Sequence, residues 1–277
     1  MSLLRFPPMP DRVSVIALAL GGLLTCIEAT HAGDAEPPPI PPQVTPEPMS
    51  DDNTGFKTIF DGKTLKGWDG DPVYWRVENG AIVGETTEKT IPKYNSFIIW
   101  RGGQPKDFEL KVEYRVSQMG NSGLQYRSVE LPQVKWILRG CQFDIDGKGW
   151  GQMFYDNYAQ AMGLHLKRVT GQNYEERGRT FLALPGQLAY VAPGKTQRAL
   201  ASLGDSETIV SAISDDWNKA HLIVRGNLMI HIVNDRVMSI VIDDDAERRQ
   251  LQGALGMQVH VGPPMKVEFR NIRLKTL

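Results

Sequence analysis

The sequence is poor in cysteine, in long hydrophobic runs and in net charge. Its 277 residues include two cysteines, and 31 basic side chains nearly balance 32 acidic ones. If Cys26 is removed with an N-terminal signal, Cys141 remains alone and no disulfide can form in the mature chain. A net charge of -1 without a long basic block disfavours nucleic acid as a partner. No run reaches the roughly 20 apolar residues of a membrane-spanning helix. We therefore expect neither a membrane span nor a nucleic-acid partner.

Several catalytic motifs are also missing. The chain has no Cys-x-x-Cys or His-x-x-x-His pair to hold a metal ion, and Asp144–Gly149 lacks the spaced ligands of a calcium loop. A Gly-x-Ser-x-Gly elbow is absent, so Gly120–Gly123 is interpreted as a turn rather than as part of a serine hydrolase. Cys141 shares an alternating face with Phe143, which predicts a buried side chain rather than a nucleophile.

The N-terminus has the pattern of a secretory signal. Basic residues precede a short apolar run, Val13–Leu24, and a small-residue cleavage pattern ends at Ala32. Residues 1–32 are therefore predicted to be removed, which places the protein outside the cell or in a periplasm. A lipid anchor at Cys26 is the less favoured alternative, because Thr25 stands where a smaller residue is expected.

Proline marks the next boundary along the chain. Residues 33–53 are rich in proline, which lacks an N–H and fixes φ, so they are predicted to form a stiff linker. Residues 54–277 are long enough for one large β domain.

That domain is predicted to be all-β. Apolar and charged residues alternate along Phe108–Val116, which indicates a strand with one buried face. Asn79-Gly80 lies between two strand-like segments and predicts a hairpin. At least ten short strands without intervening helices favour two antiparallel sheets packed face to face. Only Asp243–Leu251 is predicted to be helical, and residues 147–215 are expected to form long loops and edge strands.

Three of these strands carry unusual polar residues on the face opposite their apolar residues. They are Gln125 and Arg127, then Gln142 and Asp144, and finally Gln258 and His260. A merely solvated face tends toward Lys and Glu, whereas amides, carboxylates and a histidine suit sugar hydroxyls. Trp150 and Tyr155 belong to an aromatic cluster in the following loop, where they could pack against a sugar ring.

The same domain resembles the 3-keto-disaccharide hydrolase family, long known only as a domain of unknown function. The resemblance covers about residues 54–277 and is carried by segments that follow one another in family order. These are Phe56–Trp68, Trp75–Gly84, Asp107–Arg115, Asn121–Gly123, Tyr174–Arg179, Trp217-Asn218, Arg225–Asn227 and Gly256–Ile272. It implies a concanavalin A-like jelly roll and cleavage of glycosides that are already oxidised to a ketone at C3.

The implied chemistry requires a base and a stabiliser for an enolate. A C3 ketone acidifies the C2 proton, the enolate expels the C1 oxygen, and hydration completes a net hydrolysis. We assign His260 as the base, with Asp144 or Glu175 as alternative base or general acid. Arg127 or Arg179 would stabilise the enolate. Gln125, Gln142, Gln258, Trp150 and Tyr155 complete the predicted substrate-binding set.

Two questions stay open at this level. No motif demands a cofactor, although a divalent metal ion could also stabilise an enolate. Many relatives carry a glutamate two residues before the glutamine that matches Gln142, whereas this chain has Gly140 there. The alternative to an enzyme is a carbohydrate-binding or adhesion domain of the same fold, because fold does not determine function.

Overall fold

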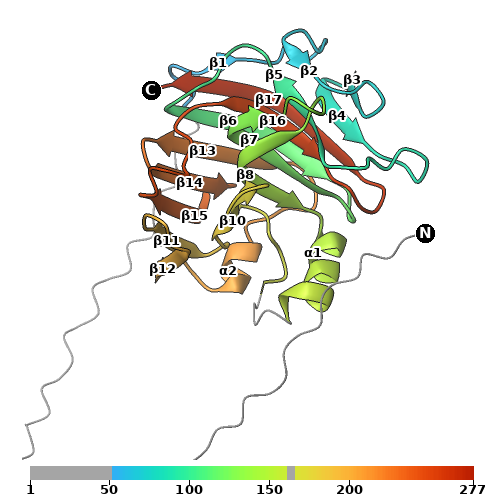
Figure 1. The fold of residues 1–277 in the computed structure, drawn as a ribbon. Coiled ribbons are helices and arrows are strands. Elements are labelled where there is room, and N and C mark those ends of the chain that lie inside the picture. The colour runs from blue at the N-terminus through green and yellow to red at the C-terminus, as the bar shows by residue number, and fades with distance from the viewer. Residues whose placement is uncertain (1–51, 161–165) are drawn as a thin grey trace, which may run out of the picture. The chain divides into compact units, whose positions relative to one another are not determined.

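The predicted alternation of apolar and polar residues produces two packed β-sheets (Figure 1). The computed structural model describes residues 52–160 and 166–277. The predicted signal, Cys26 and nearly all of the linker lie outside these ranges. Among the described helices, none is long and apolar enough to cross a membrane.

The larger sheet contains the hairpins and the longest alternating strand. Its strands are β1 (Lys57–Thr58), β3 (Trp75–Glu78), β4 (Ala81–Glu85), β6 (Phe108–Val116), β11 (Gln187–Val191), β12 (Gln197–Ser202), β13 (Asn218–Arg225), β14 (Leu228–Val233), β15 (Arg236–Asp243) and β17 (Lys266–Thr276). They follow the order β12-β11-β15-β14-β13-β6-β17-β4-β3, with β1 beside β17. The β11–β15 pair is parallel, so this sheet is mixed.

The smaller sheet carries most of the predicted site. Its strands are β2 (Trp68–Asp69), β5 (Ser96–Trp100), β7 (Asn121–Glu130), β8 (Leu138–Asp146), β9 (Asn173–Glu176), β10 (Thr180–Ala183) and β16 (Ala254–Val259). They follow the order β10-β9-β8-β7-β16-β5-β2. The register pairs Gln125 with Gln142 and Gly123 with Asp144, so the three polar strands are neighbours as expected.

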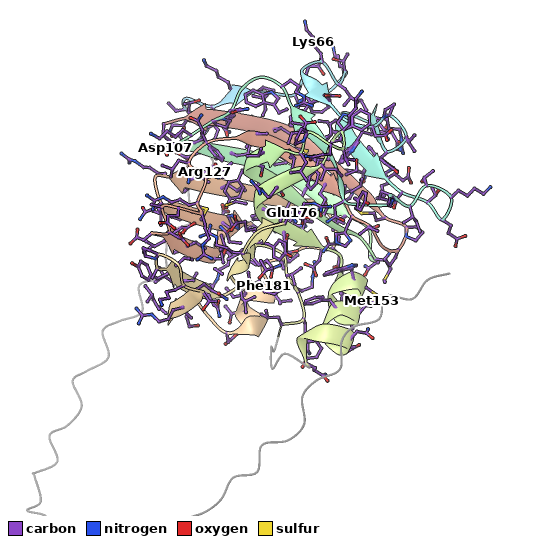
Figure 2. The ribbon with its side chains drawn as sticks, in the orientation of Figure 1. Lys66, Asp107, Arg127, Met153, Glu176 and Phe181 are labelled. Carbon is purple, nitrogen blue, oxygen red and sulfur yellow. The ribbon has the colours of Figure 1, made fainter. Side chains whose placement is uncertain are left out.

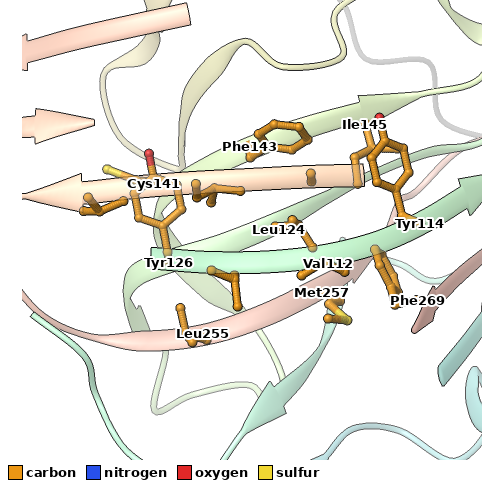
Figure 3. Packing of buried hydrophobic residues seen from close by; sticks show 14 of the residues in the cluster. Val112, Tyr114, Leu124, Tyr126, Cys141, Phe143, Ile145, Leu255, Met257 and Phe269 are labelled. Carbon is orange, nitrogen blue, oxygen red and sulfur yellow. The ribbon is translucent and has the colours of Figure 1, made fainter. Parts of the chain in front are cut away.

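The apolar faces of the two sheets form one core (Figure 3). Tyr114 on β6 meets Phe143 on β8 edge to face, with ring centroids 6.4 Å apart. Cys141 is a free, buried thiol in this core, as predicted, and burial raises its pKa to about 12. The two-sheet sandwich inferred from the sequence is therefore confirmed.

The helix predictions were wrong. Asp243 ends β15 and a turn follows it, because its carboxylate accepts bonds from Arg179 and from the backbone N–H of Asp245. The helices lie instead in the stretch expected to be loops. They are α1 (Lys148–Phe154), the π-helical η1 (Tyr155–Ala159) and α2 (Ser206–Val210).

The predicted turn at Gly120–Gly123 also needs correction. Asn121 to Gly123 form the start of β7, and the Ser122 hydroxyl donates to the Gln258 carbonyl at 2.6 Å. Ser122 therefore helps to join β7 to β16.

Candidate functional site

A pocket of about 300 Å³ lies where β8, β9 and α1 meet the loops that precede β5 and follow β16. It is bounded on one side by the two aromatic residues of α1. The residues lining it are Asn95, Asn121, Gln142, Asp144, Trp150, Phe154, Val169, Gln172, Tyr174, Glu176, Phe181 and His260.

Asp144 is the most perturbed acidic group in this pocket. Burial raises the pKa of its carboxyl to about 7, against the opposing hydrogen bonds from Gln142 and Gln172. Gln142 Nε2 donates to one carboxylate oxygen at 2.5 Å, and Gln172 Nε2 donates to the other. The side chain is thus fixed by neutral amides and has no direct ion-pair partner among the described residues.

Two hydrogen-bonded amide side chains lead from the interior of the protein to this carboxyl group. Gln258 Nε2 donates to Gln142 Oε1 at 3.0 Å, and Gln142 in turn donates to Asp144. Gly123 is required beneath this chain, because an added Cβ would lie 2.5 Å from the Gln142 side chain. Gln258 is fully buried and acts on the pocket through Gln142.

His260, which follows β16, also lines the pocket and packs against Trp150 of α1. Its ring meets Trp150 edge to face at 6.1 Å, and Trp150 stacks on Phe154 at 5.3 Å with an interplanar angle of 7°. Burial lowers the pKa of His260 to about 4, so the ring is neutral near pH 7. Its buried Nδ1 has no hydrogen-bond partner within the described residues.

The strand β9 presents alternate residues to opposite sides. Asn173 and Glu175 are buried away from the pocket, whereas Tyr174 and Glu176 line it. Burial raises the pKa of Glu176, and Asn95 Nδ2 donates to its Oε1 at 3.4 Å. Burial also raises the pKa of Tyr174 to about 12, helped by the charges of Glu176 and Asp144. Our sequence reasoning chose Glu175 and missed Glu176 by one residue.

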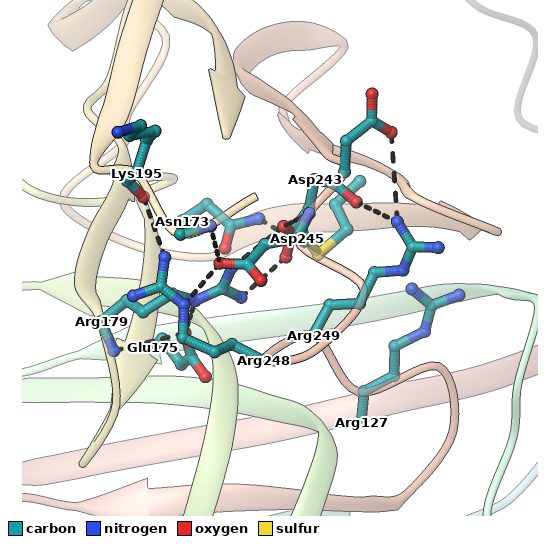
Figure 4. Close-up of polar contacts among 12 residues, drawn as sticks. Arg127, Asn173, Glu175, Arg179, Lys195, Asp243, Asp245, Arg248 and Arg249 are labelled. Carbon is teal, nitrogen blue, oxygen red and sulfur yellow. Dashed lines mark hydrogen bonds and ion pairs between the residues drawn. The ribbon is translucent and has the colours of Figure 1, made fainter. Parts of the chain in front are cut away.

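Glu175 and Arg179 belong to a separate ion cluster (Figure 4). Arg179 Nε donates to Glu175, and its two Nη atoms donate to the Asp243 carboxylate at 2.9 and 2.7 Å. Arg248 donates to the neighbouring Asp245. Every donor group of Arg179 is therefore directed at a carboxylate of this cluster, and Arg179 does not line the pocket around Asp144.

The structure also separates Arg127 from the pocket. A bulge interrupts the β7–β8 register between Tyr126 and Val129, and Arg127 has a φ of 46°. The alternation used to place Arg127 beside Gln125 therefore fails there. Its guanidinium donates to the carbonyls of Lys106 and Gly226 and to the carboxylate of Asp107, which Figure 2 labels next to Arg127.

The remaining predicted residues have mixed positions. Gln125 is fully buried and donates to the Gly140 carbonyl at 3.1 Å, and Tyr155 lies in η1 outside the described pocket lining. Gly140 has a φ of 150°, and an added Cβ would lie 2.4 Å from Ser128 Oγ. This backbone leaves no room for a glutamate side chain at position 140. His260, Asp144, Gln142 and Trp150 are thus the predicted residues that line one pocket.

The described residues do not form a recognisable set of metal ligands. Across residues 52–160 and 166–277, no three His, Cys, Asp or Glu side chains lie where they could hold one ion. His165 lies outside those ranges. We therefore assign no step to a metal.

Comparison with known proteins gives a consistent family. A family model described as a 3-keto-alpha-glucoside-1,2-lyase-like domain matches residues 55–275. A Bacteroides thetaiotaomicron protein named 3-keto-disaccharide hydrolase is 37% identical over 87 residues, which cover 29% of this chain and 30% of that relative. The matched region thus spans less than a third of the relative.

Solved structures show the same fold. Two crystal structures from Parabacteroides distasonis, each described as a candidate glycosyl hydrolase, cover 80% of this chain. They have TM-scores of 0.53 and 0.51, with 20% and 16% sequence identity, and the matches cover 94% and 99% of those chains.

Proposed function

The chain belongs to the 3-keto-alpha-glucoside-1,2-lyase-like family, and we propose that it cleaves 3-keto-glycosides by elimination followed by hydration. One observation carries this proposal beyond family membership: Asp144 lines a pocket and has a carboxyl pKa of about 7. A base with that pKa is tuned to remove a weakly acidic C–H proton near neutral pH. A surface carboxylate of pKa 3.8 would be a weaker base.

Asp144 replaces His260 as our preferred base. His260 has a pKa of about 4, which makes its ring a weaker base than the Asp144 carboxyl. The amides of Gln142 and Gln172 hold the carboxylate in one orientation. Such fixed positioning lowers the entropic cost of aligning the base with the C2 proton.

An unpaired acceptor supports a ligand rich in hydroxyl groups. Gln172 Oε1 is buried, belongs to a residue that lines the pocket, and lacks a donor among the described residues. A buried acceptor without a donor costs free energy, which a ligand hydroxyl would recover. The stacked Trp150 and Phe154 offer an aromatic wall for the apolar face of a sugar ring.

The enolate would be stabilised by neutral donors. No Lys or Arg is among the described residues that line the pocket, which argues against the roles first assigned to Arg127 and Arg179. The hydroxyl of Tyr174, with a pKa of about 12, stays protonated and could donate to an oxyanion. The Asn121 amide, on β7, offers a second donor.

We also propose that the protein acts outside the cytoplasm. The proposal depends on the basic and apolar pattern of residues 1–32. Mass spectrometry of the N-terminus after expression in a secreting host would test it. A mature chain that begins near residue 33 supports export, an acylated Cys26 supports a lipid anchor instead, and an uncleaved chain contradicts both.

The activity can be tested directly. The purified chain, with and without EDTA, is incubated with 3-keto-glucosides and with their unoxidised parents, and the released aglycone is measured. Release from the keto compounds alone is the expected result, and a fall with EDTA would add a metal requirement. Sugar binding by calorimetry without any release would overturn the proposal and leave a carbohydrate-binding domain.

A further inference from the structure

The segment Gly171-Gln172 is hydrogen-bonded to both sheets. Toward the smaller sheet, the backbone N–H of Gly171 donates to the Asp144 carbonyl at 2.9 Å, and the Asp144 N–H donates to the Gln172 carbonyl at 3.3 Å. The Gln172 side chain also donates to the Asp144 carboxylate. The backbone of this segment therefore determines where the Gln172 amide lies against the carboxyl group that we propose as the base.

Two residues of the larger sheet bond to the same segment. His231 on β14 is fully buried, and its Nδ1 lies 3.2 Å from the Gly171 carbonyl oxygen and 3.2 Å from that of Gln172. Ser239 on β15 donates to the Gly171 carbonyl at 2.7 Å. Gly171 has a φ of 84°, and an added Cβ would collide with the Met238 side chain, so this backbone packs directly against β15.

The tautomer of His231 follows from its partners. A carbonyl oxygen only accepts hydrogen bonds, so Nδ1 carries the proton and donates to the two carbonyls. Nε2 is then an acceptor, and the Tyr126 hydroxyl lies 2.9 Å from it. Burial lowers the pKa of His231 to about 4, so the ring keeps this single proton across the neutral range.

We propose that His231 is a positioning residue for the base: through Nδ1 it fixes the Gly171-Gln172 backbone and thereby the Gln172 amide on Asp144. This inference rests on the proposed function, because it concerns the base of that reaction. His231 is not among the described residues that line the pocket, so its role is exerted through Gln172. A carboxylate held in one orientation loses less entropy when it meets the C2 proton.

The remaining bonds indicate that the fold tolerates the loss of this donor. Without His231 Nδ1, the Gly171 carbonyl still accepts from Ser239, and the Gln172 carbonyl still accepts from the Asp144 N–H. Neither carbonyl is left without a donor, so His231→Leu should fold. The Gln172 carbonyl would, however, be held by one bond instead of two. We expect the Gln172 amide then to leave the Asp144 carboxylate for part of the time.

The pKa of the Asp144 carboxyl group is the direct readout. It is measured by carboxyl ¹³C NMR on the aspartate-labelled chain, for wild type and His231→Leu, and the spectrum of Asp144→Asn identifies the signal. Gln172 stabilises the charged form of this carboxyl group, so weakening that bond should raise its pKa by about one pH unit. An unchanged pKa in folded His231→Leu would overturn the inference.

The pH dependence of activity gives the second readout. On a 3-keto-glucoside, the acid limb of kcat/KM should move to higher pH in His231→Leu by the same amount as the pKa. At pH 7 the ionised fraction of the base, and with it kcat/KM, should fall about fivefold, whereas KM should change less than kcat. General damage to the core would lower activity without moving this limb.

Two further variants test the Nδ1 donor itself. His231→Asn places an amide N–H near the position of Nδ1 and should keep the wild-type pKa of Asp144 and the wild-type acid limb. Equal shifts in His231→Asn and His231→Leu would contradict a role for Nδ1. Ser239→Ala removes the other donor to Gly171 and should raise the pKa by a smaller amount. If His231→Leu does not fold, an unchanged pKa in Ser239→Ala would overturn the inference instead.

The matched control is His221→Leu. His221 on β13 pairs with Glu109 at 2.9 Å and is not among the described residues that line the pocket, so this variant should match wild type in both readouts. A shift in His221→Leu as large as that in His231→Leu would contradict a specific role for His231.

The other titratable groups around Asp144 are retained in every variant. Among the described residues they are Glu176 and Tyr174 on β9, Asp146 on β8 and His260 after β16. A shift that appears in His231→Leu and not in His231→Asn therefore does not come from a changed neighbouring charge.

The two readouts also separate the possible failures. A wild-type chain that is inactive on every keto compound would contradict the proposed function, and the NMR measurement would still test the positioning by His231. An active wild type whose Asp144 pKa does not respond to His231→Leu would contradict the positioning alone.

Discussion

Asp144 and Glu175 are buried to a similar degree, with 6% and 9% exposure, yet they lie in opposite electrostatic settings. Glu175 is paired with Arg179 in the ion cluster, whereas Asp144 is held only by neutral amides. A buried carboxylate with a matched cation is stabilised as a charge. A buried carboxylate with amides alone keeps a raised pKa and can exchange a proton. The comparison separates a carboxylate held in an ion cluster from the one that we propose as the base.

Replacing Asp144 should produce the largest effect on activity. Asp144→Asn removes the base, while the new Oδ1 still accepts from Gln142 and the new Nδ2 can donate to Gln172 Oε1 once that amide turns over, so folding should persist. We expect kcat/KM on a 3-keto-glucoside to fall about 1000-fold, within the range of lost general-base catalysis. Asp215→Asn, at an exposed position, is the matched control. Retention of full turnover by Asp144→Asn would remove Asp144 from the mechanism.

Replacing Arg179 should affect stability instead of chemistry. Arg179→Met leaves Glu175 and Asp243 buried without their shared cation, which typically costs about 3 to 4 kcal/mol. Urea unfolding measures this loss, and Arg139→Met at an exposed position should stay within about 0.5 kcal/mol of wild type. If Arg179→Met unfolded at the same urea concentration as wild type, the ion cluster would contribute little to stability.

The raised pKa of Asp144 predicts a pH-dependent stability. The folded state holds this proton more tightly than the unfolded state, whose pKa is near 3.8. The resulting stabilisation is complete below that value and is lost as the pH rises through about 7. Between pH 5 and pH 8, the free energy of unfolding of wild type should fall by about 3 kcal/mol more than that of Asp144→Asn. If the free energy of unfolding depended on pH in the same way for the two proteins, that result would contradict the raised pKa.

Replacing a residue of the aromatic wall should have the smallest effect on activity. Trp150→Ala removes the ring that stacks on Phe154 and faces His260, and we expect KM for a 3-keto-glucoside to rise about tenfold with a smaller change in kcat. The control is Trp217→Ala, because Trp217 lies against Arg115 and Arg270 on the larger sheet. An unchanged KM in Trp150→Ala would remove this wall from substrate binding.

The alternation of apolar and polar residues predicted where the strands lie, but it was less successful in predicting the sheet face on which each side chain lies. Asp144, Gln142 and Gln258 share one side of the smaller sheet, as their spacing indicated. Arg127 was misplaced because a bulge shifts the register between Tyr126 and Val129, and local periodicity contains no signal for it. Glu176 could have been found from Tyr174–Arg179, but no residue pattern there shows which face of a four-residue strand is turned to the pocket.

The sequence by itself determined the sandwich, because a two-residue period buries one face of each strand wherever the pairing occurs. It also supplied the family resemblance and four of the pocket residues. Tertiary structure decided which polar side chains line the pocket and how burial shifts their pKa values. The pKa values of Asp144 and His260 result from burial by residues distant in the chain, and the separation of Glu175 from Glu176 depends on which sheet face each one joins.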